Sequence, residues 1–292
     1  MQVGETVEIY DRKNKLVVEE KEYQKKTLNF LYNTKKGRFL LKYIVAKPFF
    51  SKLRGVYQKS IFSKRDIKPF IEKYNVDMNG FNIKEYRTFN DFFKRKKGLI
   101  IEGSKDILIS PADAKLFIYD ITDDLRFDVK KSNYSLSEIT GDAWLSKQFK
   151  GGKCLVFRLC VSDYHRYINI DTGELKEVTR IEGELHTVRP ISEDYRVFSR
   201  NTRVVSVLDL DNLGKVVQIE VGALLIGCIR NNNQKYFIKG EEKGYFEFGG
   251  STIILLLKDN VKIDEDIIEQ INQGREVKVS IGERIGLICS KD

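Results

Sequence analysis

The chain is poor in cysteine. Only four of its 292 residues are cysteines (Cys154, Cys160, Cys228 and Cys289), and they form no Cys-x-x-Cys pair. Zinc motifs need closely spaced ligands, and disulfide frameworks need a higher density of thiols. The sequence therefore predicts no metal site, and it indicates buried, reduced thiols in a cytosolic protein.

A long hydrophobic run is also missing. The longest apolar stretch, residues 221–229, is far shorter than the roughly 20 residues of a membrane-spanning helix. The chain opens with polar residues, so we expect no secretory signal peptide. Any contact with a membrane must then be peripheral.

Acidic residues are absent from one long segment. No Asp or Glu stands between Glu22 and Asp66, whereas Lys and Arg recur there among Phe, Leu, Ile and Tyr. The whole chain has 51 Lys and Arg against 42 Asp and Glu, which gives a formal net charge of +9. This balance favours an anionic partner, such as phospholipid head groups, nucleic acid or an acidic substrate, without choosing between them.

The basic segment has the pattern of an amphipathic helix. Apolar side chains recur on one helical face and cations border it, until Pro48, which we expect to end or kink the helix. Two interpretations remain open, because this face could enter the head-group boundary of a membrane or pack on the rest of the protein. The apolar positions are Leu40, Leu41, Ile44 and Val45, and the bordering cations are Arg38, Lys42 and Lys47.

The texture of the chain changes near residue 100. Before it, residues 64–74 and 85–94 favour further helices, and the first 27 residues have two alternating apolar pieces that could pair as a hairpin. After it, short apolar runs are separated by Gly, Asn and Asp, which is typical of β-strands; the clearest are residues 153–158, 203–207 and 216–221. We therefore predict an α+β protein, with a helical, basic region over residues 1–99 and a strand-rich, mainly antiparallel domain over residues 100–292.

One step inside the second region is unusual. Gly249, Gly250, Ser251 and Thr252 stand between two apolar, strand-like runs. Glycine inside a strand marks a bulge, a bend or a close backbone approach. Without a Cβ at residue 250, the Ser251 hydroxyl could reach the carbonyl carbon of the preceding peptide bond, although the same residues could simply form a turn.

A serine that attacks an amide needs a base, and the chain has only two histidines. His165 follows the apolar run that ends at Cys160, so we expect it at a strand end. His186 stands in a strand-like run, residues 184–188. A lone histidine can equally be a core or surface residue, and the pattern alone does not decide between these roles.

Motifs along most of the chain from about residue 28 resemble the phosphatidylserine decarboxylases, pyruvoyl enzymes that cut themselves at a Gly-Ser bond. The resemblance includes the Gly249-Gly250-Ser251-Thr252 step and other blocks in the same order. These are Leu31-Tyr-Asn-Thr34, Lys47-Pro-Phe-Phe50, Phe92-Phe-Lys-Arg95, Ser110-Pro-Ala-Asp113, Val129 to Leu136 with its Tyr-Ser-Leu, Asp163-Tyr-His-Arg166, Leu185-His-Thr-Val188 and Val221-Gly-Ala223.

The resemblance implies a reaction and its setting. Self-cleavage between Gly250 and Ser251 would give a β chain, residues 1–250, and an α chain, residues 251–292, and would convert Ser251 into a pyruvoyl group. That group would serve in the decarboxylation of phosphatidylserine to phosphatidylethanolamine. The expected partners are the substrate and an anionic membrane surface, with the protein peripheral on the cytoplasmic face; a homodimer is left open.

The resemblance also implies roles for individual residues. Asp113 matches the aspartate of an Asp-His-Ser triad, although an Asp after Pro could equally cap a turn. His165 matches the first of two histidines spaced three residues apart, but the second position is Ile168 here. Either His165 serves both proton-transfer steps, or His186 enters the site, or the chain matures slowly or not at all.

Two other function classes therefore stay beside the decarboxylase. The first is an inactive or processing-impaired homologue that binds anionic lipid, which Ile168 suggests. The second is a nucleic-acid-binding module, against which the sequence shows no recognition-helix or aromatic-platform signature and concentrates its cations in an amphipathic segment. We expect no nucleic-acid partner.

Overall fold

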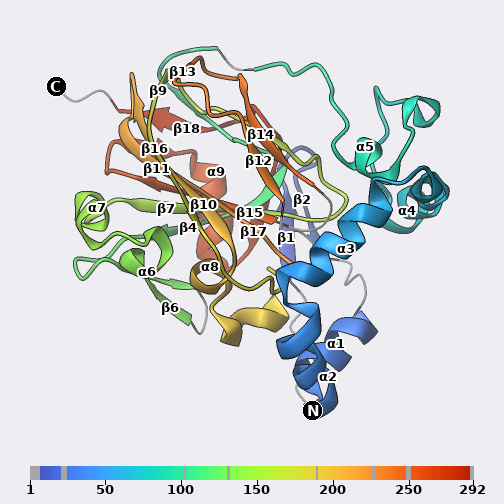
Figure 1. Cartoon of the computed structure of the whole chain (residues 1–292). Helices are drawn as coiled ribbons and strands as arrows, with labels where there is room; N and C mark the ends of the chain where they lie inside the picture. Colours follow the sequence, from blue (N-terminus) through green and yellow to red (C-terminus); the bar gives the residue numbers. More distant parts are fainter. Residues whose placement is uncertain are drawn as a thin grey trace.

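A ten-stranded sheet forms the centre of the protein (Figure 1). The computed structural model describes residues 7–20, 25–101, 103–129, 132–188, 190–224, 228–247 and 251–289. The strand order is β13-β9-β10-β11-β15-β7-β4-β17-β1-β2, and every neighbouring pair is antiparallel except β1 and β17. The prediction of a strand-rich, mainly antiparallel α+β protein is confirmed. The strands are β1 (Glu8–Asp11), β2 (Leu16–Glu19), β4 (Ala114–Asp120), β7 (Lys153–Leu159), β9 (Gly173–Ile181), β10 (Arg203–Leu210), β11 (Gly214–Val221), β13 (Tyr236–Phe237), β15 (Ser251–Leu257) and β17 (Glu276–Val279).

The strand that begins at Ser251 runs through the middle of this sheet. β15 pairs with β11 on one side and with β7 on the other, and each of its seven residues is buried. A strand with both edges paired and both faces covered needs a continuous apolar sequence, which residues 253–257 supply. The chain after the Gly-Gly step is therefore held on both sides by backbone hydrogen bonds.

Each face of the large sheet is covered by other elements. Two three-stranded sheets and helix α9 (Glu265–Asn272) share a hydrophobic core with one face. A two-stranded hairpin and three short helices pack on the opposite face. The small sheets have the orders β12-β14-β8 and β16-β18-β3, with β3 (Ile107–Ile109), β8 (Arg166–Ile168), β12 (Ile229–Asn231), β14 (Glu242–Phe246), β16 (Val261–Ile263) and β18 (Arg284–Ile288). The opposite face carries β5 (Arg126–Val129), β6 (Ser132–Ser135), α6 (Leu136–Thr140), α7 (Ala143–Ser146) and α8 (Val197–Arg200).

The first described residues confirm the predicted hairpin. β1 and β2 pair antiparallel, with Ile9 opposite Val18. β1 also pairs in parallel with β17, so the hairpin extends one edge of the large sheet. The two ends of the chain are thereby joined in one sheet, which sequence patterns did not predict.

The N-terminal helices lie outside the sheet, with α1 and α2 projecting from the body and α3 running along its side (Figure 1). Pro48 starts α3, so the predicted interruption at this residue is confirmed. A π-helical turn, Leu41–Val45, precedes it. The helices are α1 (Lys25–Asn33), α2 (Lys35–Leu40), α3 (Pro48–Gln58), α4 (Ile67–Tyr74) and α5 (Phe89–Phe93), with 3-10 helices at Ile61–Asp66, Ile83–Glu85, Lys147–Phe149 and Pro190–Tyr195.

The cysteines and the helix lengths test two of the predictions. Cys154 and Cys160 are buried, but Cys228 is half-buried and Cys289 is exposed, so the prediction of four buried thiols is wrong for the last two. Cys289 follows the end of β18, where the chain leaves the sheet. Among the described residues, no helix is both long and apolar enough to cross a membrane.

Candidate active site

Ser251 occupies the first position of the central strand β15. Its register partner is Leu159 at the end of β7, and its side chain is fully buried. The hydroxyl oxygen makes no hydrogen bond to any residue in the described part of the chain. A buried hydroxyl without a partner is uncommon, because its desolvation is uncompensated. Gly249 and Gly250 lie outside the described residues, so the predicted bend before Ser251 remains a prediction.

His165 lies in the loop that leaves β7, directly before β8 begins at Arg166. The prediction of a strand-end histidine is confirmed. The imidazole is fully buried, and its centroid is 4.1 Å from that of the Phe93 ring. Its Nδ1 lies 2.8 Å from the Asp163 carbonyl oxygen. Because a carbonyl oxygen only accepts, Nδ1 carries the proton in this contact, and Nε2 is the nitrogen that can act as a base.

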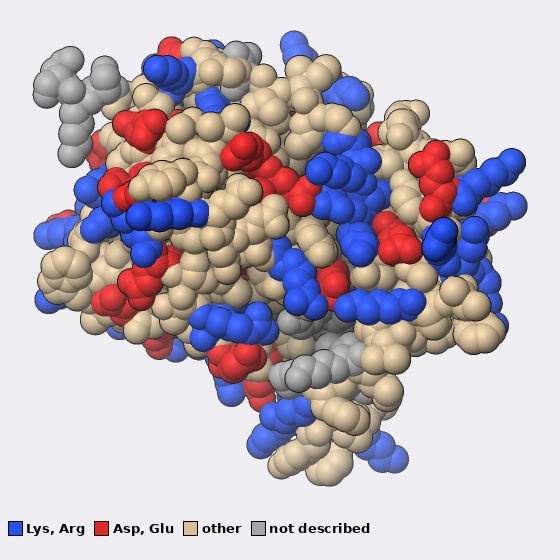
Figure 2. Space-filling model, turned by 45° about the horizontal axis from the view of Figure 1, so that its top comes forward, with Lys and Arg blue, Asp and Glu red and all other residues tan. Residues whose placement is uncertain are grey.

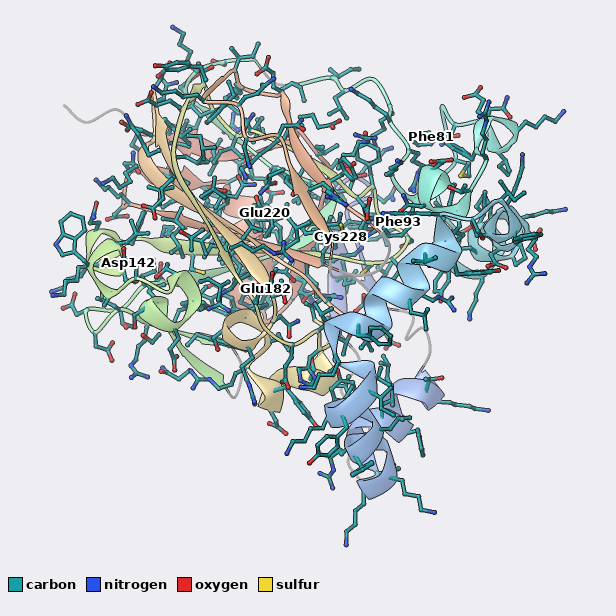
Figure 3. All side chains as sticks on the ribbon, in the orientation of Figure 1. Phe81, Phe93, Asp142, Glu182, Glu220 and Cys228 are labelled. Atoms are coloured by element: carbon teal, nitrogen blue, oxygen red, sulfur yellow. The ribbon has the colours of Figure 1, made fainter. Side chains whose placement is uncertain are left out.

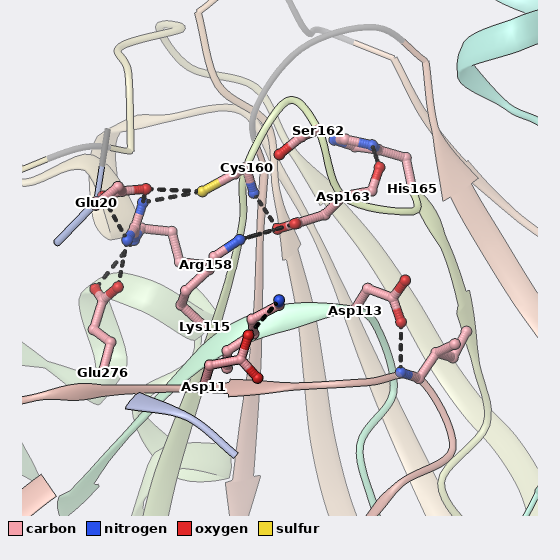
Figure 4. Close-up of polar contacts among 12 residues, drawn as sticks. Asp11, Glu20, Asp113, Lys115, Arg158, Cys160, Ser162, Asp163, His165 and Glu276 are labelled. Atoms are coloured by element: carbon pink, nitrogen blue, oxygen red, sulfur yellow. Dashed lines mark hydrogen bonds and ion pairs between the residues drawn. The ribbon is translucent and has the colours of Figure 1, made fainter. Parts of the chain in front are cut away.

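The loop around His165 is fixed by a buried ion pair (Figure 4). The Lys115 ammonium contacts both carboxylate oxygens of Asp163, at 2.8 and 2.7 Å. The same carboxylate accepts the backbone N–H of Cys160 at 2.7 Å. Since the Asp163 carbonyl holds the imidazole, Lys115 orients His165 through Asp163.

A second ion cluster lies beside this pair. Arg158, on β7, binds the carboxylates of Glu20 and Glu276, which come from the two ends of the chain. Burial acts to raise the pKa of Glu20, but the charge and hydrogen bonds of Arg158, together with the Cys160 thiol and the Lys115 charge, lower that pKa to about 2. Burial raises the pKa of the Cys160 thiol, 3.0 Å from Glu20, to about 12, so this thiol stays protonated.

Asp113 stands immediately before β4, at the same edge of the sheet as Ser251 and the His165 loop. One carboxylate oxygen accepts the backbone N–H of Ile281 at 2.7 Å, and the other lies 3.5 Å from the Lys97 ammonium. The described contacts of Asp113 therefore join the start of β4 to the turn after β17. Its role in a triad remains a prediction.

Ile168, which replaces the second family histidine, is buried in the core of the sheet face that also carries Leu159 and Ile253. Its backbone N–H donates to the Pro111 carbonyl at 3.0 Å. Pro111 stands two residues before Asp113, so the backbone at position 168 lies close to the segment that carries Asp113. An isoleucine there can supply packing but no proton transfer.

His186 belongs to the packing of helix α1. Its imidazole contacts the Tyr32 hydroxyl at 3.4 Å and Glu184 at 3.1 Å, and it packs on the Tyr195 ring. The prediction of a strand at residues 184–188 is wrong, because in the described structure this stretch makes an isolated bridge, Glu184 to Asn201, rather than a strand. The His186 backbone still lies near the end of β11, through the Leu224 N–H and the Asn201 side chain.

Several residues at this edge were not found from the sequence. Lys115 is a charged residue inside the apolar run of β4, and that exception was the available signal. Asp163 belongs to a motif found in the sequence, but its position against His165 depends on Lys115, which is 48 residues away along the chain. Phe93 was recognised as a helix residue, and its contact with the imidazole could not be inferred from helical periodicity.

Acidification should destabilise the protein through His186. Burial lowers the pKa of His186 below its usual 6.5, so between that pH and the folded pKa the unfolded chain binds a proton that the folded chain does not. Stability is therefore lost as the pH falls below about 6.5 towards the lowered pKa of His186 in the folded chain. We expect His186→Gln to have a smaller decrease in melting temperature over this interval than the original chain. Equal decreases in the two proteins would contradict a buried, neutral His186.

Comparison with known proteins identifies the family. The family model described as phosphatidylserine decarboxylase matches residues 87–287. The chain is 49% identical to phosphatidylserine decarboxylase proenzyme 2 of Clostridium acetobutylicum, over 96% of this chain and 98% of that protein. It is 42% identical to the proenzyme of Clostridium tetani, over 98% and 100% of the two chains, and 41% identical to that of Clostridium perfringens, over 96% and 99%.

The matches span both the described site and the elements that hold it. They include Asp113, the His165 loop and Ser251, which the fold gathers at one edge of the large sheet. The relatives are enzymes by name, and the similarity covers nearly the full length of each pair. The chain belongs to the phosphatidylserine decarboxylase family.

Proposed function

We propose that the chain is a proenzyme that cuts itself between Gly250 and Ser251 and then decarboxylates phosphatidylserine to phosphatidylethanolamine. The single observation that carries the proposal is the buried Ser251 hydroxyl, which has no hydrogen-bond partner among the described residues. It stands at the first position of a strand fixed on both sides, next to the loop that holds His165. The family membership supplies the reaction that such a serine would perform.

Self-cleavage assigns a task to each of these groups. His165 takes the hydroxyl proton at Nε2 while Asp163 holds the Nδ1 proton in place. The Ser251 oxygen bonds to the Gly250 carbonyl carbon, the carbon–nitrogen bond breaks, and the proton goes to the Ser251 nitrogen, which leaves an ester. Removal of the Ser251 Cα proton expels the Gly250 carboxylate. The remaining unsaturated residue takes up water and releases ammonia, which gives the pyruvoyl group at the start of β15.

The residues around Ser251 fit such a group. Its carbon atoms are those of Ser251, which is already enclosed in the core and carries an oxygen with no competing contact in the described chain. When present, a pyruvoyl group supplies an electron sink for decarboxylation. His165 is the nearby residue suited to return a proton at Nε2, since it is buried and fixed in one tautomer by Asp163.

A specific observation favours a second candidate, a homologue that binds lipid but matures poorly. Ile168 occupies the position of the usual second histidine and is fully enclosed in the apolar core. Asp113 is engaged by Ile281 and Lys97. In this alternative the missing second histidine leaves the cleavage step slow or absent, and the chain binds anionic lipid without turnover.

The mass of the purified protein separates the two candidates. We expect two fragments, the smaller corresponding to residues 251–292 with a pyruvoyl end that blocks sequencing. Ser251→Ala should give full-length chain alone, because the attacking oxygen is missing. A single full-length species from the unaltered gene, even after prolonged incubation, would support the lipid-binding homologue instead.

Ile168→His should speed up self-cleavage. The new imidazole would stand on a residue whose backbone bonds Pro111, in the loop that leads to Asp113, and a positioned general base contributes about 10²-fold or more to a rate. The measurement is the half-time for conversion of freshly made full-length chain. Ile168→Asn is the matched control, since it also places a polar group in the core but supplies no base. Complete processing of the unaltered chain within minutes, with no gain in the His variant, would show that Ile168 does not weaken the site.

The helical region is suited to docking on a lipid surface. Residues 25–65 contain twelve Lys and Arg and no Asp or Glu. In Figure 2 the part of the molecule that projects at the bottom of the view shows basic and uncharged surface. Soluble proteins rarely expose many large apolar side chains together. This segment exposes Phe39, Tyr43, Ile44, Phe49, Leu53, Val56, Ile61 and Phe62.

The two interpretations of this segment, packing on the protein and entry into a membrane, apply to different faces of its helices. Leu41 is buried and packs with Leu28 and Leu31 of α1, which accounts for part of the apolar pattern as ordinary core. Phe49 and Phe62 stay outside, 76% and 70% exposed. Lys59, at the end of α3, binds Glu247 at 3.0 Å, so the end of this helix adjoins the residue that follows β14. We infer that the outer face enters anionic lipid and brings the site to its substrate.

The cell compartment follows from the same proposal. The protein would be peripheral, on the cytoplasmic face of the membrane, where thiols remain reduced. All four cysteines are free thiols in the structure.

Acidic substitutions on the outer face should weaken vesicle binding. Phe49→Asp with Phe62→Asp removes two apolar anchors and adds two negative charges, so we expect binding to anionic vesicles to fall by about tenfold or more. Trp144→Asp is the control, because Trp144 is 72% exposed on α7, away from α3 (Figure 1). Co-sedimentation at low and high salt measures the effect. Binding that neither the double substitution nor salt reduces would exclude this surface as the docking site.

A further inference from the structure

A cluster of polar side chains is buried between the large sheet and the β12-β14-β8 sheet. Its centre is an ion pair between Glu220 of β11, which is fully buried, and Lys243 of β14, which is 5% exposed. The surrounding residues of this core are apolar. Figure 3 shows Glu220 in the interior of the molecule, with Cys228 and Phe93 towards the N-terminal helices.

Hydrogen bonds extend the ion pair to every strand of the small sheet. The Lys243 ammonium lies 2.7 Å from Glu220 and donates to the Ser206 hydroxyl at 3.2 Å. Glu220 also accepts from Gln218 at 2.9 Å and from Asn231 of β12 at 3.0 Å. The Tyr167 hydroxyl of β8 donates to Asn231 at 2.7 Å. The cluster therefore joins β8, β12 and β14 to β10 and β11.

The cluster stands close to Ser251 in the register of the sheet. Glu220 pairs with Ile253, and residues that pair across antiparallel strands share a face. Side chains two apart on a strand also share a face, so Ser251 points to the same side as Ile253 and Glu220. The ion pair is thus one diagonal step from the serine, on the side where the small sheet lies.

The small sheet is joined to the other groups of the proposed reaction, His165 and the chain that precedes Ser251. β8 follows His165 directly, and the His165 carbonyl accepts the Phe246 N–H of β14 at 2.9 Å. β14 is also the strand that precedes the Gly249-Gly250 step. A shift of β14 relative to β11 would therefore move both the imidazole and the chain before Ser251.

Stability alone does not account for this cluster. Desolvation of two charges offsets much of their attraction, and buried ion pairs can often be replaced by uncharged residues of similar volume without loss of stability. A pair retained beside a reacting serine is better explained by the geometry that it imposes, because only partners at one distance and direction satisfy it.

We propose that Glu220 and Lys243 are positioning residues for self-cleavage. The pair fixes β14 on β11, and with β14 the backbone of His165, whose carbonyl accepts the Phe246 N–H, so that the strand leading towards Ser251 and the proposed base keep one position relative to β11. It remains in place after the bond is cut, because both residues precede residue 250, and it keeps the new chain end beside the start of β15. This inference rests on the proposed self-cleavage.

The first test uses an uncharged pair of the same shape. Glu220→Gln with Lys243→Met removes both charges and retains one oxygen, which can accept from Gln218 or from Asn231. We expect a melting temperature close to that of the original chain and self-cleavage slower by about 10- to 100-fold, as misplaced reacting groups produce. Lys243→Arg with Glu220 retained keeps both charges, and it should cleave faster than the double variant. Unchanged cleavage in the double variant would overturn the inference.

A control variant separates positioning from general weakening. Asp171 is a buried carboxylate at the opposite end of the same strands, where it accepts from Asn212 and Leu213 in the turn between β10 and β11. Asp171→Asn should lower the melting temperature with little effect on the cleavage rate. If Asp171→Asn and the double variant have the same melting temperature and cleave equally slowly, the cluster acts only through stability.

The second test does not depend on cleavage. In full-length Ser251→Ala protein, the uncharged pair should lower the hydrogen-exchange protection of residues 242–247 by about tenfold and leave residues 252–257 protected, because β15 keeps its partners on both sides. Unchanged protection of residues 242–247 would refute the inference by itself. Failure of the original chain to cleave would instead refute the proposed function, and the exchange result would still decide the role of the pair.

Discussion

The pairing of β15 on both sides is the constraint on which the site depends. Its backbone bonds to β11 and β7 run from Ser251 or Thr252 to the end of the strand, so the residue to be modified cannot drift from its place. The same pairing explains how a cut before Ser251 would leave the fold standing. β15 stays between two strands of the longer chain, and β17 stays between β4 and β1. The proposed cut at this position would be tolerated because the sheet, rather than the covalent link, would hold the new chain start.

The proposed cleavage needs a base beside Ser251, and buried charges at the sheet edge fix the loop that carries the proposed base, His165. Lys115 holds Asp163, Asp163 holds His165, and Phe93 lies against the imidazole. Arg158 adds a second layer by joining Glu20 and Glu276 from the two ends of the chain. These charges are costly to bury, and each is paired, as buried charges must be. The edge is therefore rigid where the reaction would occur, whereas the apolar groups of the helical region remain on the surface.

Local patterns predicted the elements of the fold better than their assembly. Alternation and apolar runs located β7, β10 and β11, and Pro48 predicted the interruption between helical segments, because these features depend on neighbouring residues alone. The contacts of β15 with β7 and β11, and of β1 with β17, join residues far apart in the chain and leave no periodic trace. The same holds for the site. Motifs pointed to Asp113, His165 and Ser251, but Lys115, Glu220 and Lys243 acquire their importance only from strands that meet in space. His186 was expected in a strand, and it lies instead in the packing of α1, where Tyr32 and Tyr195 enclose it.

The isoleucine at position 168 affects the two stages of the proposed reaction differently. Cleavage must remove a proton from an alcohol and stabilise a developing imidazolium, so a missing base partner slows it directly. Turnover afterwards requires mainly that one proton be returned, which His165 can supply from its present position. Cleavage happens once in the life of each molecule, whereas turnover repeats. The absence of a histidine at position 168 would therefore slow mainly self-cleavage, which tolerates delay. This holds as long as the serine, the imidazole and the preceding peptide stay aligned until the cut occurs. The buried pair of Glu220 and Lys243 and the ion pair of Lys115 and Asp163 are the contacts that would keep them aligned.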